Sequence, residues 1–131
     1  MDVKREYDFN KLRRLARASG SESVVNAVEY IHAPWINQAD GFVTEVYDDV
    51  AFFSARIGGK KLRLYAIAVA GEKQGAGYGN AMMARLKMLC QENGLACITL
   101  RVSKEEGRVG FYIRHGGKIV GEHDGDYEVE I

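Results

Sequence analysis

The sequence predicts an α/β (α+β) fold: one mixed, mostly antiparallel central sheet flanked by helices. Three observations predict it. Apolar residues recur at helical spacing near the N-terminus, change to strand spacing from residue 42, and return to helical spacing after a glycine-rich loop at 70–79. The chain has 131 residues, 47% of them hydrophobic and 27% charged, which is typical of one ordinary domain spanning 1–131.

The chain opens with two amphipathic helices. Apolar residues recur at helical spacing from 8 to 18, and Gly20 ends this segment. Ser21 or Ser23 can cap a second helix, which Pro34 ends. Its buried stripe is predicted to contain Val24, Val25, Val28 and Ile31. The basic side of the first helix could contact nucleic acid or an acidic protein, but a solvated face is the favoured interpretation.

Three strands follow the helical pair. The β-rich runs are 42–47, 50–57 and 60–69, and short turns at 48–49 and 58–59 separate them. Turns of this length join neighbouring strands as hairpins. We therefore expect three consecutive antiparallel strands.

The glycine-rich loop connects the third strand to a helix that begins at Asn80 and stops at Asn93-Gly94. Its buried side is predicted to contain Met82, Met83, Leu86, Leu89 and Cys90. The rest of the chain is predicted to form a strand at 96–102, a short helix at 105–115, and a hairpin of strands 118–123 and 127–131. The order of strand, glycine loop and helix is therefore the central feature of the pattern.

Charge and hydropathy exclude several classes of protein. Lysine plus arginine and aspartate plus glutamate each total 18, so the formal charge is zero, and a dedicated nucleic-acid binder is not expected. No apolar run approaches the roughly 20 residues that span a bilayer, and the N-terminus lacks the pattern of a signal peptide. We expect a cytoplasmic protein that does not bind membranes.

The cysteines and histidines predict no metal site. Cys90 and Cys97 do not complete a set of four zinc ligands, and both are expected to be buried, reduced thiols. The three histidines are scattered without metal-ligand spacing. We therefore expect no metal cofactor.

The glycine-rich loop is a candidate anion site. Gly75, Gly77 and Gly79 would let an anion approach backbone amides at the start of a helix. A P-loop is excluded because no Gly-Lys-Ser/Thr follows, and a dinucleotide-binding loop is excluded because Asn80 replaces the third glycine. The glycines alone fit a tight turn equally well.

The segment 69–79, Val-Ala-Gly-Glu-Lys-Gln-Gly-Ala-Gly-Tyr-Gly, resembles the signature of the GCN5-related N-acetyltransferases (GNATs). Gln74, Gly77 and Gly79 occupy its characteristic positions. The resemblance extends over nearly the whole chain, from the helical pair and meander to the C-terminal hairpin. The family's first strand is reduced here to a stub at 3–7.

The resemblance implies that acetyl-CoA is the acyl donor. The strand residues Ile67, Ala68 and Val69 would bind the pantetheine arm, and an amide near Ala68 or Val69 would polarise the thioester carbonyl. The loop and the start of the helix would bind the pyrophosphate through Gln74, Gly75, Ala76, Gly77, Tyr78, Gly79 and Asn80.

The resemblance also implies roles in catalysis. Tyr112, in the run 110–117, matches the family tyrosine that faces the coenzyme sulfur, so it is the expected general acid. Arg63 stands where protein-lysine acetyltransferases of the family have a glutamate. Glu45 is therefore expected to act as the base through water, with the acidic turn at 48–49 as an alternative. Glu105 and Arg108 also depart from the family pattern near the coenzyme.

The resemblance implies an acceptor site near the end of the second helix and the strand after it. Trp35, Tyr47 and Tyr65 are the expected contacts, with His32 as a further candidate; Trp35 is also expected to pack in the fold. The acceptor could be a small amine, an amino sugar, a protein N-terminus or a lysine.

Two functions remain open. The first is an N-acetyltransferase that transfers an acetyl group from acetyl-CoA to a primary amine, directly and in a ternary complex. The alternative is a non-catalytic acetyl-CoA-binding or protein-interaction module. A homodimer is also expected, because the strand 127–131 would leave an exposed sheet edge.

Overall fold

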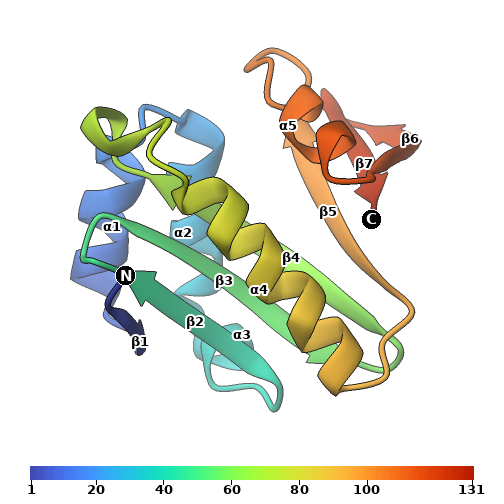
Figure 1. Ribbon diagram of the computed structural model, residues 1–131, viewed down its shortest axis with the longest axis horizontal. Helices are drawn as coiled ribbons and strands as arrows, with labels where there is room; N and C mark the ends of the chain where they lie inside the picture. Colours follow the sequence, from blue (N-terminus) through green and yellow to red (C-terminus); the bar gives the residue numbers. More distant parts are fainter.

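The computed structural model describes all residues from 1 to 131 as one seven-stranded sheet with helices on both faces (Figure 1). The strand order is β1-β2-β3-β4-β5-β7-β6, and only the β4–β5 pair is parallel. The elements are β1 (Val3–Arg5), α1 (Phe9–Ala18), α2 (Glu22–Ile31), α3 (Pro34–Asn37), β2 (Phe42–Tyr47), β3 (Ala51–Gly58), β4 (Lys61–Val69), the 3-10 turn η1 (Gly71–Lys73), α4 (Tyr78–Glu92), β5 (Cys97–Ser103), α5 (Val109–Arg114), β6 (Lys118–His123) and β7 (Asp126–Glu130). The predicted fold class is confirmed.

Side-chain caps start the two N-terminal helices. The Asp8 carboxylate accepts a hydrogen bond from the backbone N–H of Lys11, and the Ser21 hydroxyl accepts one from that of Val24. Ser21 is thus the cap of α2. The predicted stripe of α2 is buried except for Val25, which is half-buried. Both helices pack on the same face of the sheet (Figure 1).

The three central strands pair as predicted, with one irregularity. Ser54 pairs with Ala66 while Ala55 pairs with Leu64, so Tyr65 is an extra residue that makes a β-bulge in β4. The bulge changes which residues face each side of the sheet. Leu64 and Ile67 pack in the core under α4, and Ala66 packs in the core under α1 and α2.

Beyond its first residues, β4 separates from β5. The two strands are paired only where Lys61–Arg63 meets Cys97–Thr99. Past that point they diverge, and β5 leads away from β4 towards α5 and the C-terminal hairpin (Figure 1). Helix α4 covers the other strands on this face and buries all five residues predicted for it. The divergence opens the sheet in its middle.

The two edges of the sheet are β1 and β6. The stub at the N-terminus pairs with β2 over three residues, from Val3 with Tyr47 to Arg5 with Glu45. The prediction that 127–131 forms an edge is wrong, because β7 lies between β5 and β6 and is paired on both sides. The homodimer stays a prediction, and pairing of C-terminal edges would have to use β6.

Several local predictions also need correction. Helix α4 starts two residues before Asn80, and α5 starts only at Val109, because Gly107 adopts a positive φ of 67° in the preceding turn. Cys97 is half-buried rather than buried. Trp35 is not a packing residue, since it is 70% exposed. No helix of the structure combines the length and the apolar character needed to cross a membrane.

Candidate active site

Two cavities meet where β4 and β5 diverge. The helix-side cavity, of about 500 Å³, lies between α2, β4, β5 and α5. The loop-side cavity, of about 430 Å³, lies between the end of β4, the glycine loop and α5. Both are lined by Ile67, Arg108 and Tyr112. A molecule in one cavity would therefore lie next to a molecule in the other.

The loop-side cavity is suited to an anion. Its lining contains two arginines, Arg108 and Arg114, and no carboxylate. Gly75 and Gly77 have positive φ angles of 84° and 93°, and Gly77 is the residue from which the 15-residue helix α4 starts. Uncapped amides at a helix N-terminus attract negative charge. Backbone shape and arginine charge both favour a phosphate-bearing ligand here.

The expected coenzyme residues divide into two groups. Those that line the loop-side cavity are Ile67, Ala68, Val69, Gln74, Gly75 and Gly79. Those that do not line it are Ala76, Gly77, Tyr78 and Asn80. The second group surrounds the start of α4, where backbone amides rather than side chains would meet a ligand.

The polar side chains of these residues stabilise the loop itself. The Gln74 amide donates hydrogen bonds to the backbone oxygens of Ser19 and Val69, each at 3.1 Å. The Tyr78 hydroxyl donates to Asp48 at 2.7 Å, and Asn80 lies 3.0 Å from the His115 ring nitrogen. These side chains therefore hold the loop in shape instead of pointing at a ligand.

Close packing of α5 on α4 positions Tyr112. A Cβ atom at Gly79 would lie only 3.2 Å from Cζ of Phe111, so glycine allows α5 to approach. Tyr112 follows on the same short helix and is 7% exposed. Its hydroxyl has no hydrogen-bond partner in the protein. Burial raises the pKa of Tyr112 to about 12, although the nearby charge of Arg108 opposes this. The phenol is therefore protonated at neutral pH.

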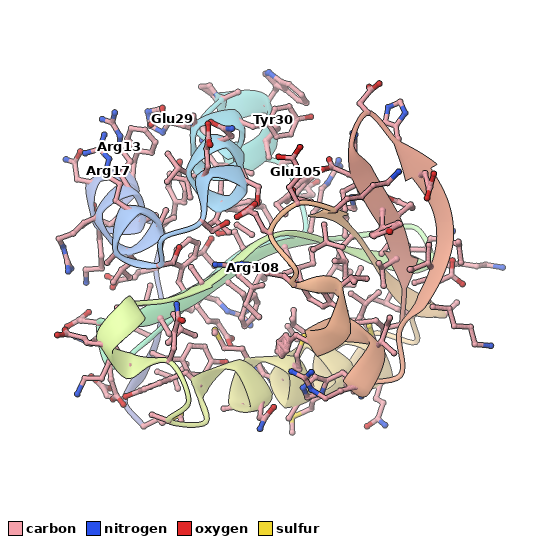
Figure 2. All side chains as sticks on the ribbon, turned by 90° about the horizontal axis from the view of Figure 1, so that it is seen from above. Arg13, Arg17, Glu29, Tyr30, Glu105 and Arg108 are labelled. Carbon is pink, nitrogen blue, oxygen red and sulfur yellow. The ribbon has the colours of Figure 1, made fainter.

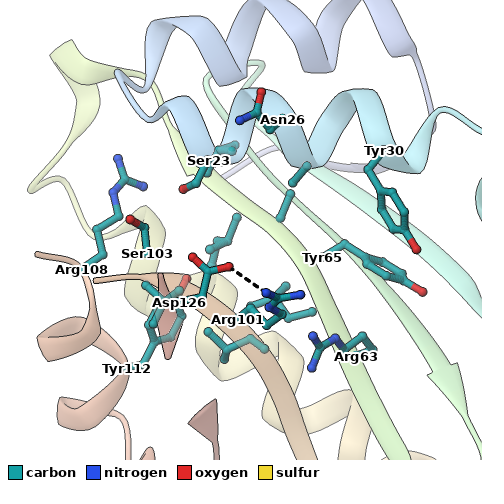
Figure 3. Close-up of a pocket in the computed structure, with 17 residues that line it drawn as sticks. Ser23, Asn26, Tyr30, Arg63, Tyr65, Arg101, Ser103, Arg108, Tyr112 and Asp126 are labelled. Carbon is teal, nitrogen blue, oxygen red and sulfur yellow. Dashed lines mark ion pairs between the residues drawn. The ribbon is translucent and has the colours of Figure 1, made fainter. Parts of the chain in front are cut away.

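The helix-side cavity is rich in arginine and tyrosine (Figure 3). Arg63, Arg101 and Arg108 line it together with a single carboxylate, Asp126. Arg101 forms an ion pair with Asp126 at 3.3 Å. Tyr65 lines this cavity, as expected of an acceptor contact. Tyr30 lines it too, and the centroids of the two rings are 6.3 Å apart.

Asp126 and Arg101 are site residues that the sequence analysis missed. Asp126 is the first residue of β7 and directly follows the turn at 124–125, where an aspartate is common for turn geometry alone. In the sequence, Arg101 occupies a solvent-exposed position of a strand in which buried and more exposed residues alternate. Only the pairing of β7 with β5 brings the two residues together. No local pattern in the sequence could have revealed them.

Glu45 and Tyr47 lie away from both cavities. Glu45 is 4% exposed in the layer between the sheet and α4, with its carboxylate 3.1 Å from Arg85 and 3.2 Å from Arg5. The Tyr47 hydroxyl donates a hydrogen bond to it. Burial would raise the pKa of Glu45, but the hydrogen bonds from Arg85 and Arg5 outweigh burial and lower it. The geometry thus corrects both expectations: Glu45 forms a structural ion pair, and Tyr47 belongs to the core.

The other acceptor and base candidates also lie outside the cavities. Trp35 contacts Tyr30 edge-on at a centroid distance of 5.9 Å and lines neither cavity. His32 stacks on Phe9 at 3.6 Å. In the acidic turn, Asp48 accepts the hydrogen bond from Tyr78, and Asp49 pairs with a lysine of α1 at 2.9 Å.

The residues that line the two cavities indicate which chemistry the site can support. Neither cavity is lined by a cysteine or a histidine. No three histidine, cysteine, aspartate or glutamate side chains are grouped so that they could hold a metal ion. What the site offers is an anion-binding loop, a buried phenol at the junction, and a second cavity.

Comparison with known proteins agrees with this arrangement. Residues 9–117 match the model of the acetyltransferase (GNAT) family. No protein with curated function matches the sequence.

Solved structures show the same fold. PaiA N-acetyltransferase from Thermoplasma acidophilum, in complex with coenzyme A, is 17% identical, with a TM-score of 0.75 over 99% of this chain and 98% of its own. A ribosomal-protein-alanine N-acetyltransferase from Escherichia coli is 15% identical, with a TM-score of 0.75 over 98% and 89%. An aminoglycoside 6'-N-acetyltransferase complexed with coenzyme A is 17% identical, with a TM-score of 0.72 over 100% and 96%. At these identities the likeness shows the fold alone.

Proposed function

The chain belongs to the acetyltransferase (GNAT) family, and on that premise we propose that it transfers an acetyl group from acetyl-CoA to the primary amine of an acceptor. The observation that carries the proposal is the meeting of the two cavities at Ile67, Arg108 and Tyr112. One cavity suits a phosphate-bearing donor and the other can hold an acceptor. The acetyl group would pass directly between two molecules bound at the same time.

The donor would lie along the open edge of β4. Past Arg63 this edge has no pairing with β5, so backbone groups around Ala68 and Val69 are placed to bind the amides of an extended ligand. The glycine loop and Arg114 would hold the pyrophosphate. A backbone N–H near Ala68 or Val69 could stabilise the carbonyl oxygen as negative charge develops on it.

The acceptor must lose a proton before or during attack. An amine with a pKa of about 10.4 costs roughly 4–5 kcal/mol to deprotonate at pH 7. Asp126 is the only carboxylate in the lining of either cavity, and Arg101 pairs with it. Of the arginines that line the helix-side cavity, Arg101 and Arg63 are paired with carboxylates, so it is mainly the charge of Arg108 that would disfavour a bound ammonium and lower its pKa. We infer that this positive field, with water as the proton acceptor, takes the place of a glutamate base.

Tyr112 would stabilise the departing thiolate. Its pKa of about 12 lies above the roughly 8.5 of a thiol, so complete proton transfer would be uphill. A hydrogen bond that strengthens as negative charge develops on sulfur avoids that cost. The carbon–nitrogen bond forms and the carbon–sulfur bond breaks. The amine proton passes to solvent, and the thiolate is reprotonated from solvent.

Two measurements test the proposal in sequence. Calorimetry should show binding of acetyl-CoA to the intact chain. A panel of primary amines should then contain at least one that releases coenzyme A thiol and yields an acetylated amine by mass spectrometry. Binding without turnover on any amine would favour the non-catalytic acetyl-CoA-binding module, and absence of binding would exclude the transferase and leave only a protein-interaction module.

A further inference from the structure

The charges of the helix-side cavity are not balanced. Arg101 is paired with Asp126, and Arg63 is paired at 2.6 Å with Glu128, which lies outside the lining. The side chain of Arg108 forms no ion pair within 4 Å and no hydrogen bond, and its charge acts on Glu106 only at longer range, where it helps to lower the pKa of that carboxyl. The carboxylate two residues away, Glu106, accepts a hydrogen bond from Ser21 at 2.6 Å. The cavity therefore contains one arginine that is free to bind a ligand.

Arg108 lies at the junction of the two cavities rather than on an outer helix face. It is half-buried and lines both cavities at their junction. In Figure 2 it lies in the middle of the molecule beneath α2, whereas Arg13 and Arg17 point outward from α1. A half-buried guanidinium that no carboxylate contacts directly favours binding of a carboxylate or phosphate, which it can contact with two parallel hydrogen bonds.

The opposite end of the same cavity is aromatic. Figure 3 shows Arg108 and Ser103 at one end and Tyr30 and Tyr65 at the other. Tyr112, next to which the acetyl group would arrive, is on the Arg108 side in this view. An acceptor would thus place its amine and an anionic group together at the Arg108 end and an apolar portion between the tyrosines.

We propose that the acceptor is an α-amino acid with an aromatic or large apolar side chain, whose carboxylate binds Arg108. Such a molecule carries its amine and carboxylate on one carbon, so the binding of the carboxylate positions the amine beside the junction. Its side chain would extend along the apolar lining towards Tyr30 and Tyr65. The inference rests on the proposed acetyl transfer, which would convert this acceptor to an N-acetylamino acid and release coenzyme A thiol.

Matched acceptors test the anionic group. We expect kcat/KM for phenylalanine to exceed that for phenylalaninamide and phenethylamine, which lack the carboxylate, and that for glycine, which lacks the side chain. Arg108→Gln should lower the ratio of kcat/KM for phenylalanine to kcat/KM for phenylalaninamide by about 10–100-fold, as expected for loss of a charged hydrogen bond that only the carboxylate makes. Arg108→Lys should restore part of the loss. Arg17→Gln removes the same charge from the outer surface of α1 and should leave the preference intact.

Three results would overturn the inference. Equal rates for phenylalanine and its amide would show that no carboxylate is bound. A preference for O-phosphoethanolamine would assign Arg108 to a phosphate. Weaker acetyl-CoA binding by Arg108→Gln in calorimetry, with all acceptors affected alike, would assign Arg108 to the donor.

A binding experiment separates this inference from the transferase proposal. If no amine is acetylated, calorimetry of phenylalanine on the protein saturated with coenzyme A still gives a result. Binding that Arg108→Gln abolishes would support the amino acid site without catalysis. Absence of binding would contradict the site whatever the fate of the transferase proposal.

Discussion

Burial gives Tyr112 and Glu45 different chemical properties. Tyr112 is buried without a hydrogen-bond partner, and burial raises its pKa to about 12. Glu45 is buried too, but hydrogen bonds from Arg85 and Arg5 hold its pKa below the ordinary value of 4.5. The carboxylate is fully engaged with its donors, whereas the phenol is free to interact with a ligand. Of these two residues, only Tyr112 lines the cavities and can interact with charge that develops there.

We predict that Tyr112→Phe lowers turnover by roughly 10²–10⁴-fold with little change in the Michaelis constant for acetyl-CoA. The substitution removes one hydroxyl and keeps the ring that packs α5 on the sheet. The lost hydrogen bond strengthens only as the thiolate forms, so the effect belongs to kcat. Steady-state kinetics of thiol release measure both constants.

Tyr47→Phe is the matched control for this prediction. It removes a hydroxyl from another buried tyrosine, whose partner is Glu45 and which lines neither cavity. Its turnover should equal that of the parent. If Tyr112→Phe turned over at the parent rate as well, Tyr112 would be structural, and solvent alone would stabilise the thiolate.

Glu45→Gln should lower the free energy of unfolding by about 1–3 kcal/mol and leave acetyl transfer unchanged, because it removes the charge that Arg85 and Arg5 contact. Urea unfolding measures the first effect and thiol release the second. Glu29→Gln, which disrupts a surface pair with Arg13, should cost much less. A folded Glu45→Gln protein without activity would return Glu45 to the role of base.

The contribution of the Glu45 ion pairs to the free energy of unfolding should depend on pH. The pKa of Glu45 is lower in the folded chain than in the unfolded chain, so its contribution is complete above about pH 4.5. It is lost as the pH falls through the folded value. The stability difference between the parent and Glu45→Gln should therefore shrink in acid, and urea unfolding at several pH values measures it. A difference that grew in acid would contradict this ion pair.

At the scale of residues, the family motif predicted where a side chain lies better than the pattern of apolar and polar residues did. Tyr112 and Tyr65 line the helix-side cavity, where the resemblance leads us to expect them, and their roles there stay predictions. The places of Glu45 and Tyr47 could not be predicted, because β2 is buried on both faces and alternation does not tell which face α4 covers. Trp35 was misjudged because residue type predicts burial only on average, and α3 projects it outward.

At the scale of elements, the glycine loop is the part that a single substitution tests best. We predict that Gly77→Val weakens acetyl-CoA binding at least roughly tenfold in calorimetry. A Cβ atom at this position would meet nothing within 4 Å, so the damage comes from the positive φ of 93°, which a β-branched residue adopts only under strain. The backbone N–H groups at the start of α4 would then no longer point together towards one bound anion.

Gly59→Val provides the control for strain alone. Gly59 also has a positive φ, of 59°, and open space around it, but it belongs to the turn between β3 and β4 and lines neither cavity. This variant should lose stability without losing affinity for acetyl-CoA. A folded Gly77→Val protein with parental affinity would show that the loop does not bind the donor.

The helices and strands were easier to predict than the order in which the strands pair in the sheet. The helices and hairpins follow from local periodicity and turn residues, and their centres agree with the structure. The insertion of β7 between β5 and β6 is a long-range pairing that leaves no local trace, which is why the predicted edge was wrong. The bulge at Tyr65 was equally invisible, because a single extra residue does not interrupt the β-rich run.

At the scale of the whole molecule, the divergence of β4 and β5 explains how one small sheet could bind two substrates. The strands are joined for three residues and then separate, with one cavity towards α2 and another towards the glycine loop. The two cavities share Tyr112. Neither cavity is lined by a cysteine or a histidine. The proposed direct transfer between two bound substrates rests on this arrangement.

Initial velocities measured while acetyl-CoA and the best acceptor are both varied test this claim most directly. Direct transfer between two bound substrates predicts intersecting lines in a double-reciprocal plot. It also predicts that the intact protein, incubated with acetyl-CoA alone, gains no acetyl group by mass spectrometry. Parallel lines together with a stable acetylated protein would show that the acetyl group passes through the enzyme, and would contradict transfer between the two cavities.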